Sequence, residues 1–119
     1  MSLSHGLRRV EAFLMERLSR SIAVHVADES GERREYRFSI RAATAGLAVG
    51  SDPACHIRLT GLGIRPVHAR LQPLSNHWVL KHLPDGQRLP LPRTFEGDYD
   101  TRVDRTPFEI GRYRLQISD

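Results

Sequence analysis

Apolar and polar positions alternate with a period of two through most of the chain after residue 20. One alternating run covers residues 22–26 and a second covers residues 36–40. Residues 28–32 lie between them and include Gly31, which favours a turn. Two alternating runs around a glycine-containing turn predict a β-hairpin.

Further short runs of strand type follow, separated by glycines and prolines. They cover residues 47–49, 56–59, 69–71, 78–83, 108–110 and 113–117. Many short strands at close spacing indicate an all-β sandwich. Prolines and glycines gather between residues 84 and 107, so we expect this segment to be the least regular part of the chain.

Residues 5–20 follow a helical period instead. Their apolar positions recur at steps of three and four, at Leu7, Val10, Leu14 and Leu18. This spacing predicts an amphipathic helix, which either binds a partner or a second copy or docks on its own domain. We therefore expect an N-terminal helical segment, residues 1–20, and a β-sandwich domain, residues 21–119.

The length of 119 residues predicts one domain, large enough to fold without a disulfide or metal. Cys55 is the only cysteine, which excludes an internal disulfide and fits a reducing compartment. No apolar stretch approaches the 18 or so residues needed to cross a bilayer. We expect a cytoplasmic location and no membrane segment.

The formal net charge is +4, and Lys81 is the only lysine among 18 basic residues. Guanidinium groups bind phosphate through two parallel hydrogen bonds, so an arginine-rich chain is compatible with nucleic-acid or phosphoprotein binding. The arginines are spread along the chain, and no helix-turn-helix or RNA-recognition signature is present. Nucleic-acid binding is therefore the weaker alternative.

Reactive side chains do not form a recognisable catalytic or metal site. Cys55 and His56 are neighbours at a predicted strand, so their side chains should point to opposite faces and share no proton. The histidines at 68, 77 and 82 lack a cysteine pair or a helical His-x-x-x-His. We predict no catalytic residue, no metal and no cofactor.

The segment from Leu47 to Leu71 reads LAVGSDPACHIRLTGLGIRPVHARL, and Gly86 follows in a later turn. Gly50, His68-Ala69 and Gly86 stand in an order that resembles the forkhead-associated (FHA) family. The family pattern is Gly-Arg, then Ser-x-x-His-Ala, then Asn-Gly on three successive loops. The resemblance covers roughly residues 21–118. It implies an FHA/SMAD-like β-sandwich of about eleven strands, with peptide-binding loops at one end.

The resemblance also implies a binding site. Its loops would carry Gly50, Ser51, Arg65, Pro66, His68, Asp85 and Gly86. His68 would brace its loop by hydrogen bonding to backbone. Ser51 stands where the family has its phosphate-contacting Arg, and Arg65 stands where it has a phosphate-contacting Ser. Asp85 replaces the Asn that holds the bound peptide backbone.

These exchanges bear directly on phosphate recognition. A phosphothreonine carries about −1.5 to −2 charges, and each hydrogen bond to a charged group contributes about 1.5–3 kcal/mol. Losing two such contacts would weaken binding by about a hundredfold to ten-thousandfold. We therefore predict a protein–protein interaction module, not an enzyme, that binds a protein or peptide without strict phosphothreonine dependence.

Three alternatives stay open. Arg65 and Ser51 could exchange roles and bind phosphothreonine through a rearranged site. Degenerate FHA-like domains also resemble the assembly domains of type III secretion ring proteins, and the N-terminal helix could form an oligomer. Arginines converging beside Gly50 would favour phosphate recognition, whereas Asp85 in that position would oppose it.

Overall fold

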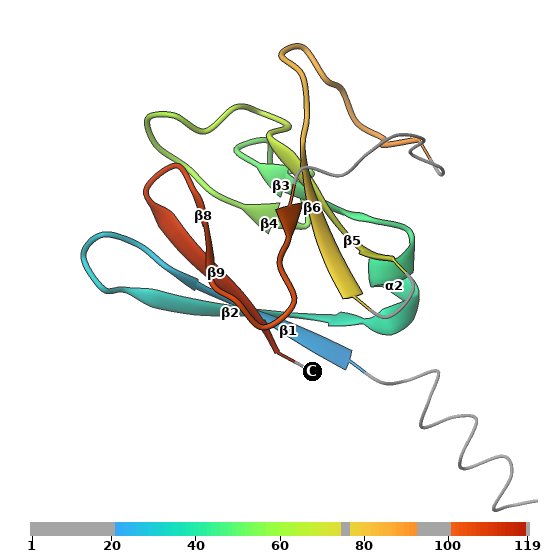
Figure 1. The fold of residues 1–119 in the computed structure, drawn as a ribbon. Helices are drawn as coiled ribbons and strands as arrows, with labels where there is room; N and C mark the ends of the chain where they lie inside the picture. The colour runs from blue at the N-terminus through green and yellow to red at the C-terminus, as the bar shows by residue number, and fades with distance from the viewer. Residues whose placement is uncertain (1–20, 75–76, 93–100, 119) are drawn as a thin grey trace, which may run out of the picture.

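The computed structural model describes residues 21–74, 77–92 and 101–118, and the predicted N-terminal helix lies outside these ranges. Within them the chain forms two sheets that stack as a β-sandwich (Figure 1). The strands are β1 (Ser21–Ala27), β2 (Arg33–Ser39), β3 (Leu47–Gly50), β4 (Ile57–Arg58), β5 (Ala69–Leu74), β6 (His77–His82), β7 (Thr101–Arg102), β8 (Phe108–Ile110) and β9 (Tyr113–Ser118). The all-β prediction is confirmed, with nine strands in the described ranges against the eleven or so implied by the resemblance.

The four-stranded sheet has the order β2-β1-β9-β8. Its β1–β2 hairpin is the predicted one, with Val24 opposite Tyr36. The turn closes through a hydrogen bond from Asp28 N to Glu32 O at 3.0 Å. On the other side of β1 lies β9, the C-terminal strand, and both its neighbours are antiparallel to it.

A short helix, α2 (Ile40–Thr44), follows β2. The prediction that Ile40 continues the strand is wrong. Ser39 is the N-cap of the helix, and its side chain accepts a hydrogen bond from Ala42 N at 3.1 Å. A serine N-cap followed by alanines favours a helical turn, and this local preference overrides the alternating pattern.

The five-stranded sheet has the order β4-β3-β5-β6-β7. The β4 strand pairs with β3 in parallel, with Val49 opposite Ile57, while the other pairs are antiparallel. It contains only Ile57 and Arg58, so His56 and Leu59, the two ends of the expected strand 56–59, lie outside it. Within residues 84–107, which were expected to be the least regular part, the structure places the two-residue strand β7.

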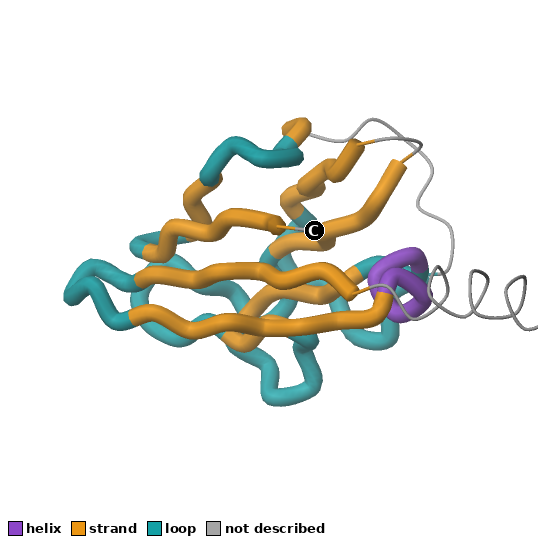
Figure 2. Tube along the Cα trace, turned by 90° about the horizontal axis from the view of Figure 1, so that it is seen from below, coloured by secondary structure: helices purple, strands orange, loops and turns teal. Residues whose placement is uncertain are grey.

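The core lies between the two sheets (Figure 2). Ile22 and Leu115 of one sheet and Leu47 and Leu71 of the other are fully buried in it. Burying a large aliphatic side chain contributes about 1.5–3 kcal/mol, so these alternating positions account for the sandwich. The helix α2 has five residues, and no described helix has the length and apolar character required to cross a bilayer.

Within the part of the chain that the structure describes, one charged side chain is fully buried. Arg70 of β5 donates from Nη1 to Pro92 O at 2.7 Å and from Nη2 to Ala45 O at 3.1 Å. Its Nε donates to Gln72 Oε1 at 2.8 Å. A buried charge needs such partners to offset its loss of hydration. Arg70 therefore ties the segment after β6 to the end of α2.

Candidate functional site

The backbone at Gly50, the last residue of β3, lies directly against the β4–β5 loop. A Cβ atom at Gly50 would lie 2.2 Å from Pro66 O, so no larger residue fits without movement. Beyond it, Ser51 N donates to Arg65 O at 3.1 Å and Asp52 N donates to Pro66 O at 3.0 Å. The first two predicted loops are therefore joined through backbone atoms.

His68 braces the β4–β5 loop from inside. Its Nδ1 accepts a hydrogen bond from Arg65 N at 3.2 Å, which requires a neutral ring. Burial lowers the pKa of His68, and the charge of Arg65 and the nearby His82 lower it further. The rings of His68 and His82 meet edge to face at 5.8 Å between centroids. His68 is therefore neutral near pH 7 and fixes the loop backbone.

The third loop reaches the second through an ion pair. Arg65 Nη1 donates to Asp85 Oδ1 at 2.7 Å. The Arg65 side chain is 35% exposed, whereas that of Asp85 is 87% exposed. The structure thus brings together the residues at two of the three exchanged positions, and each offsets the other's charge.

Asp85 and Gly86 occupy the middle of a tight turn. Gln87 N donates to Pro84 O at 3.3 Å, and Gly86 has a φ of 84°. A positive φ at this position favours glycine, because other residues meet their own carbonyl there. The turn holds Asp85 at its exposed tip, facing Arg65.

The sheet ladder fixes where these loops begin. His68 N donates to Val49 O at 2.8 Å, and Leu83 N donates to His68 O at 2.9 Å. These bonds join the ends of β3, β5 and β6 side by side. The predicted residues Gly50, His68 and Asp85 are therefore brought to one end of the five-stranded sheet.

Two residues that the sequence analysis did not assign to the site also contact it. Arg58 Nε donates to Ser51 O at 3.0 Å, which places a second guanidinium beside the first loop. The Cys55 thiol donates to Pro66 O at 3.3 Å. Alternation along β4, with Ile57 buried and Arg58 exposed, was a signal that could have located Arg58.

The structure gives a different reason why Cys55 and His56 share no proton. The Cys55 thiol faces Pro66, whereas His56 Nδ1 accepts from Ala48 N at 3.0 Å. Burial raises the pKa of the Cys55 thiol, which disfavours the reactive thiolate. Within the described ranges no group of three or more His, Cys, Asp or Glu is arranged to hold a metal ion.

The two-sheet architecture, with three joined loops at one end, defines a class of β-sandwich found among solved structures. An FHA domain studied for its phosphothreonine-dependent interactions superposes with a TM-score of 0.56 at 15% identity, over 82% of this chain and 95% of that one. The FhaA FHA domain, solved with the intracellular domain of Rv3910, gives 0.56 at 14%, over 82% and 99%.

Mycobacterium tuberculosis EmbR, solved in complex with a low-affinity phosphopeptide, gives a TM-score of 0.53 at 16% identity, over 80% of this chain and 24% of EmbR. No protein-family model and no curated protein matches the sequence. The chain therefore has the forkhead-associated fold, at 14–16% sequence identity to these three solved structures.

Proposed function

We propose that this chain is a protein-interaction module of the FHA type, not an enzyme, and that its three joined loops bind a protein partner without requiring phosphothreonine. The observation that carries the proposal is the ion pair between Arg65 and Asp85. The Asp85 carboxylate already neutralises the Arg65 guanidinium, which is the cation that a phosphate group would need at these loops.

The charges around the loops support this reading. A phosphate approaching Arg65 must displace or face the Asp85 carboxylate, 2.7 Å from the guanidinium. Because both groups are partly exposed, the pair itself adds little to stability, but the carboxylate repels a second anion at short range. Ser51 offers a hydroxyl and no charge where the family has an arginine.

The loop backbone supports binding of some partner. Gly50, Pro66 and His68 hold the first two loops together through short backbone contacts. A preformed surface loses less conformational entropy on binding than a flexible one. The loops keep a fixed backbone but differ from the family in their side chains at positions 51, 65 and 85. This combination favours recognition of a chemical group other than phosphate.

The test uses two matched peptide libraries, one with a fixed phosphothreonine and one with threonine at the same position. We expect the protein to select peptides without preference for the phosphorylated library. Backbone amide shifts measured by NMR with a selected unphosphorylated peptide should map to residues 50–52, 65–68 and 84–87. Strong phosphate-dependent selection would refute phosphate independence, and shifts confined to another surface would refute the assignment to these loops.

The rearranged site is the second candidate, and Arg58 is the observation in its favour. Its bond to Ser51 O brings a guanidinium to the loop that lacks the family arginine. If Arg58 and Arg65 together read phosphate, the phosphorylated library should be enriched and alanine at Arg58 should remove the enrichment.

A further inference from the structure

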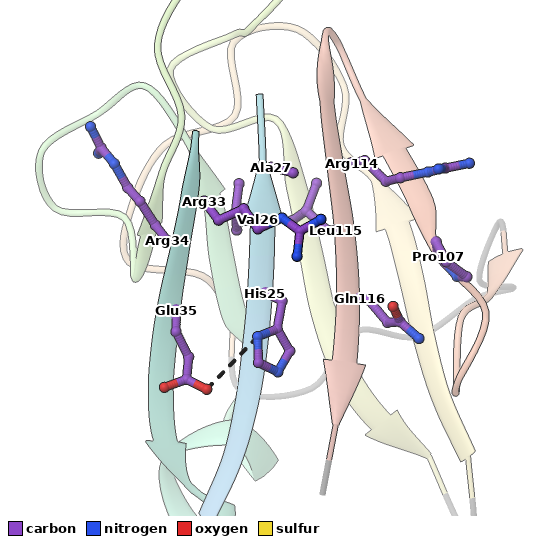
Figure 3. A pocket seen from close by; sticks show the side chains of 10 residues that line it. All are labelled: His25, Val26, Ala27, Arg33, Arg34, Glu35, Pro107, Arg114, Leu115 and Gln116. Atoms are coloured by element: carbon purple, nitrogen blue, oxygen red, sulfur yellow. Dashed lines mark ion pairs between the residues drawn. The ribbon is translucent and has the colours of Figure 1, made fainter. Parts of the chain in front are cut away.

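The outer face of the four-stranded sheet carries a second charged surface, separate from the three loops. A shallow hollow of about 460 Å³ lies over β1, and we call it the Ala27 hollow. Its lining includes His25, Ala27, Arg33, Arg114 and Gln116 (Figure 3). Strands β2, β1 and β9 contribute these residues.

The strand register places two arginines on either side of one small residue. Ala27 of β1 is the cross-strand partner of Arg33 in β2 and of Arg114 in β9. Neighbouring strands lie about 4.8 Å apart, so the two arginine Cβ atoms flank Ala27 at about 10 Å from each other. Long arginine side chains can therefore meet over Ala27, whose methyl group leaves the space open.

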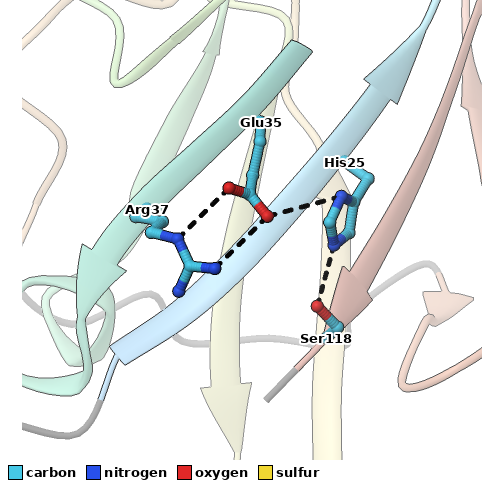
Figure 4. A network of polar contacts seen from close by, with 4 residues as sticks. All are labelled: His25, Glu35, Arg37 and Ser118. Atoms are coloured by element: carbon cyan, nitrogen blue, oxygen red, sulfur yellow. Dashed lines mark hydrogen bonds and ion pairs between the residues drawn. The ribbon is translucent and has the colours of Figure 1, made fainter. Parts of the chain in front are cut away.

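On the same face, the neighbouring charged residues pair with one another around the cross-strand partners His25 and Glu35. Glu35 accepts from Arg37 Nε at 3.2 Å and lies 3.7 Å from His25 Nδ1, while His25 Nε2 lies 2.9 Å from Ser118 Oγ (Figure 4). Glu35 also lines the Ala27 hollow, but its carboxylate is engaged by Arg37 and His25.

Arg33 and Arg114 differ from these paired residues. Both are exposed, and neither forms an ion pair or a side-chain hydrogen bond with another described residue. Glu109 is opposite Arg114 in the β8–β9 register, but no ion pair joins them. Arg33 extends across β1 toward β9, whereas Arg114 extends from β9 away from Ala27 (Figure 3). Because Arg114 is exposed and has no partner among the described residues, rotation of its side chain would bring its guanidinium toward that of Arg33. Two guanidiniums there would fit the planar two-oxygen geometry of a carboxylate.

We propose that the Ala27 hollow is a second binding surface, which takes an acidic side chain from a segment of a protein partner. Charge complementarity favours an acidic protein over nucleic acid. Glu35 and Glu109 interrupt the basic surface, so a continuous phosphate backbone would meet repulsion. The exposed strand positions of this face also carry no Phe, Tyr or Trp within the described residues on which a base could stack.

The test compares wild-type protein with a double substitution, Arg33→Ala with Arg114→Ala. A fluorescein-labelled peptide of alternating Glu and Gly is the probe, with binding measured by fluorescence anisotropy at low salt. The matched control is Arg88→Ala with Arg112→Ala, which removes two exposed arginines elsewhere and changes the net charge equally. Thermal unfolding of all three proteins checks that each is folded.

We expect the hollow variant to bind the probe at least about tenfold more weakly than both wild type and control. NMR shifts on titration should centre on residues 25–27, 33–35 and 114–116. Equal weakening in both variants would overturn the proposal, because it would show attraction by net charge alone. Tighter binding of a single-stranded oligonucleotide than of the peptide, lost in the hollow variant, would overturn the choice of an acidic protein.

Discussion

A Cβ atom at Gly46 would lie 2.5 Å from Nε of Arg70. Gly46 follows α2 and has a φ of 94°, while Arg70 is fully buried beneath it. The two residues form one unit, because the guanidinium occupies the space that any other side chain at position 46 would need.

Substitution Gly46→Ala should therefore destabilise the protein by about 2–4 kcal/mol, from left-handed backbone strain together with displacement of a buried, hydrogen-bonded charge. Urea unfolding measures the change. Gly31→Ala is the control, since Gly31 has a φ of 86° with nothing within 4 Å of its Cβ position. We expect about 1–2 kcal/mol there. Equal losses in the two variants would contradict a role for Arg70.

Gly50→Ala tests the close contact between the first two loops. The added methyl group would press on Pro66 O, so the loops must separate. We expect a loss of about 1–3 kcal/mol and weaker amide protection at Ser51 and Asp52, measured by hydrogen exchange. Unchanged protection at these two amides would show that the loops are not joined as described.

Asp85→Asn should free Arg65 for an external anion. We expect phosphothreonine peptides to bind about tenfold more tightly to this variant than to wild type, measured by isothermal titration calorimetry. Glu109→Gln changes the net charge equally on an exposed strand position away from the loops, and should leave binding unchanged. A similar gain in both variants would attribute the effect to overall charge.

Placing the family residues at all three exchanged positions is a stronger test of whether these side chains prevent phosphate binding. The triple substitution Ser51→Arg, Arg65→Ser and Asp85→Asn should raise affinity for phosphothreonine peptides by about a hundredfold or more. The unphosphorylated peptides should show no such gain. A folded triple variant without phosphate-dependent binding would indicate that the loop backbone itself has lost the phosphate site.

His68 makes stability depend on pH in a defined window. Its pKa is lowered in the folded protein, through burial first and then through Arg65 and His82, from an ordinary value of 6.5. The unfolded chain therefore binds the proton more readily, so this contribution to stability is complete above pH 6.5 and is lost as the pH falls toward the folded pKa. Denaturant unfolding from pH 7.5 downward should show the loss.

The variant His68→Gln keeps a hydrogen-bond acceptor for Arg65 N and cannot titrate, so it should flatten this pH dependence. His77→Gln provides the comparison, because it removes a histidine that lies outside the three loops. Asp28 and Asp104 also have lowered pKa values, but both act below about pH 4, outside this window. A slope that survives in the His68 variant would assign the effect to another group.

The alternating pattern was sufficient to predict the β1–β2 hairpin and the final strand, because their alternating apolar positions pack against the core. In β2 these positions, Tyr36 and Phe38, are half-buried. Ile22 and Val24 are fully buried, as are Leu115 and most of Ile117. The pattern could not predict β7, whose two residues are both exposed and are held by pairing with β6. It also misassigned Ile40, where a serine cap outweighed alternation.

The sequence was sufficient to predict which residues belong to the candidate site, but not which of them contact one another. Gly50, His68 and Gly86 could be located from the resemblance to the three FHA loops. The pairing of Arg65 with Asp85 joins residues 20 positions apart and depends on where two loops end in space. Likewise, the parallel pairing of Val49 with Ile57 brings Arg58 to Ser51, and no local pattern encodes that approach.

The bonds from His68 N to Val49 O and from Leu83 N to His68 O involve main-chain atoms alone. These bonds do not depend on the identity of the side chains in the adjoining loops. Substitutions at the exposed Asp85 or at Ser51 should thus change the loop surface at little cost to folding, whereas Arg65 also donates from Nη2 to His68 O at 3.4 Å. Under the proposed function, the affinity of the loops for a partner and the stability of the sandwich would therefore depend on different atoms.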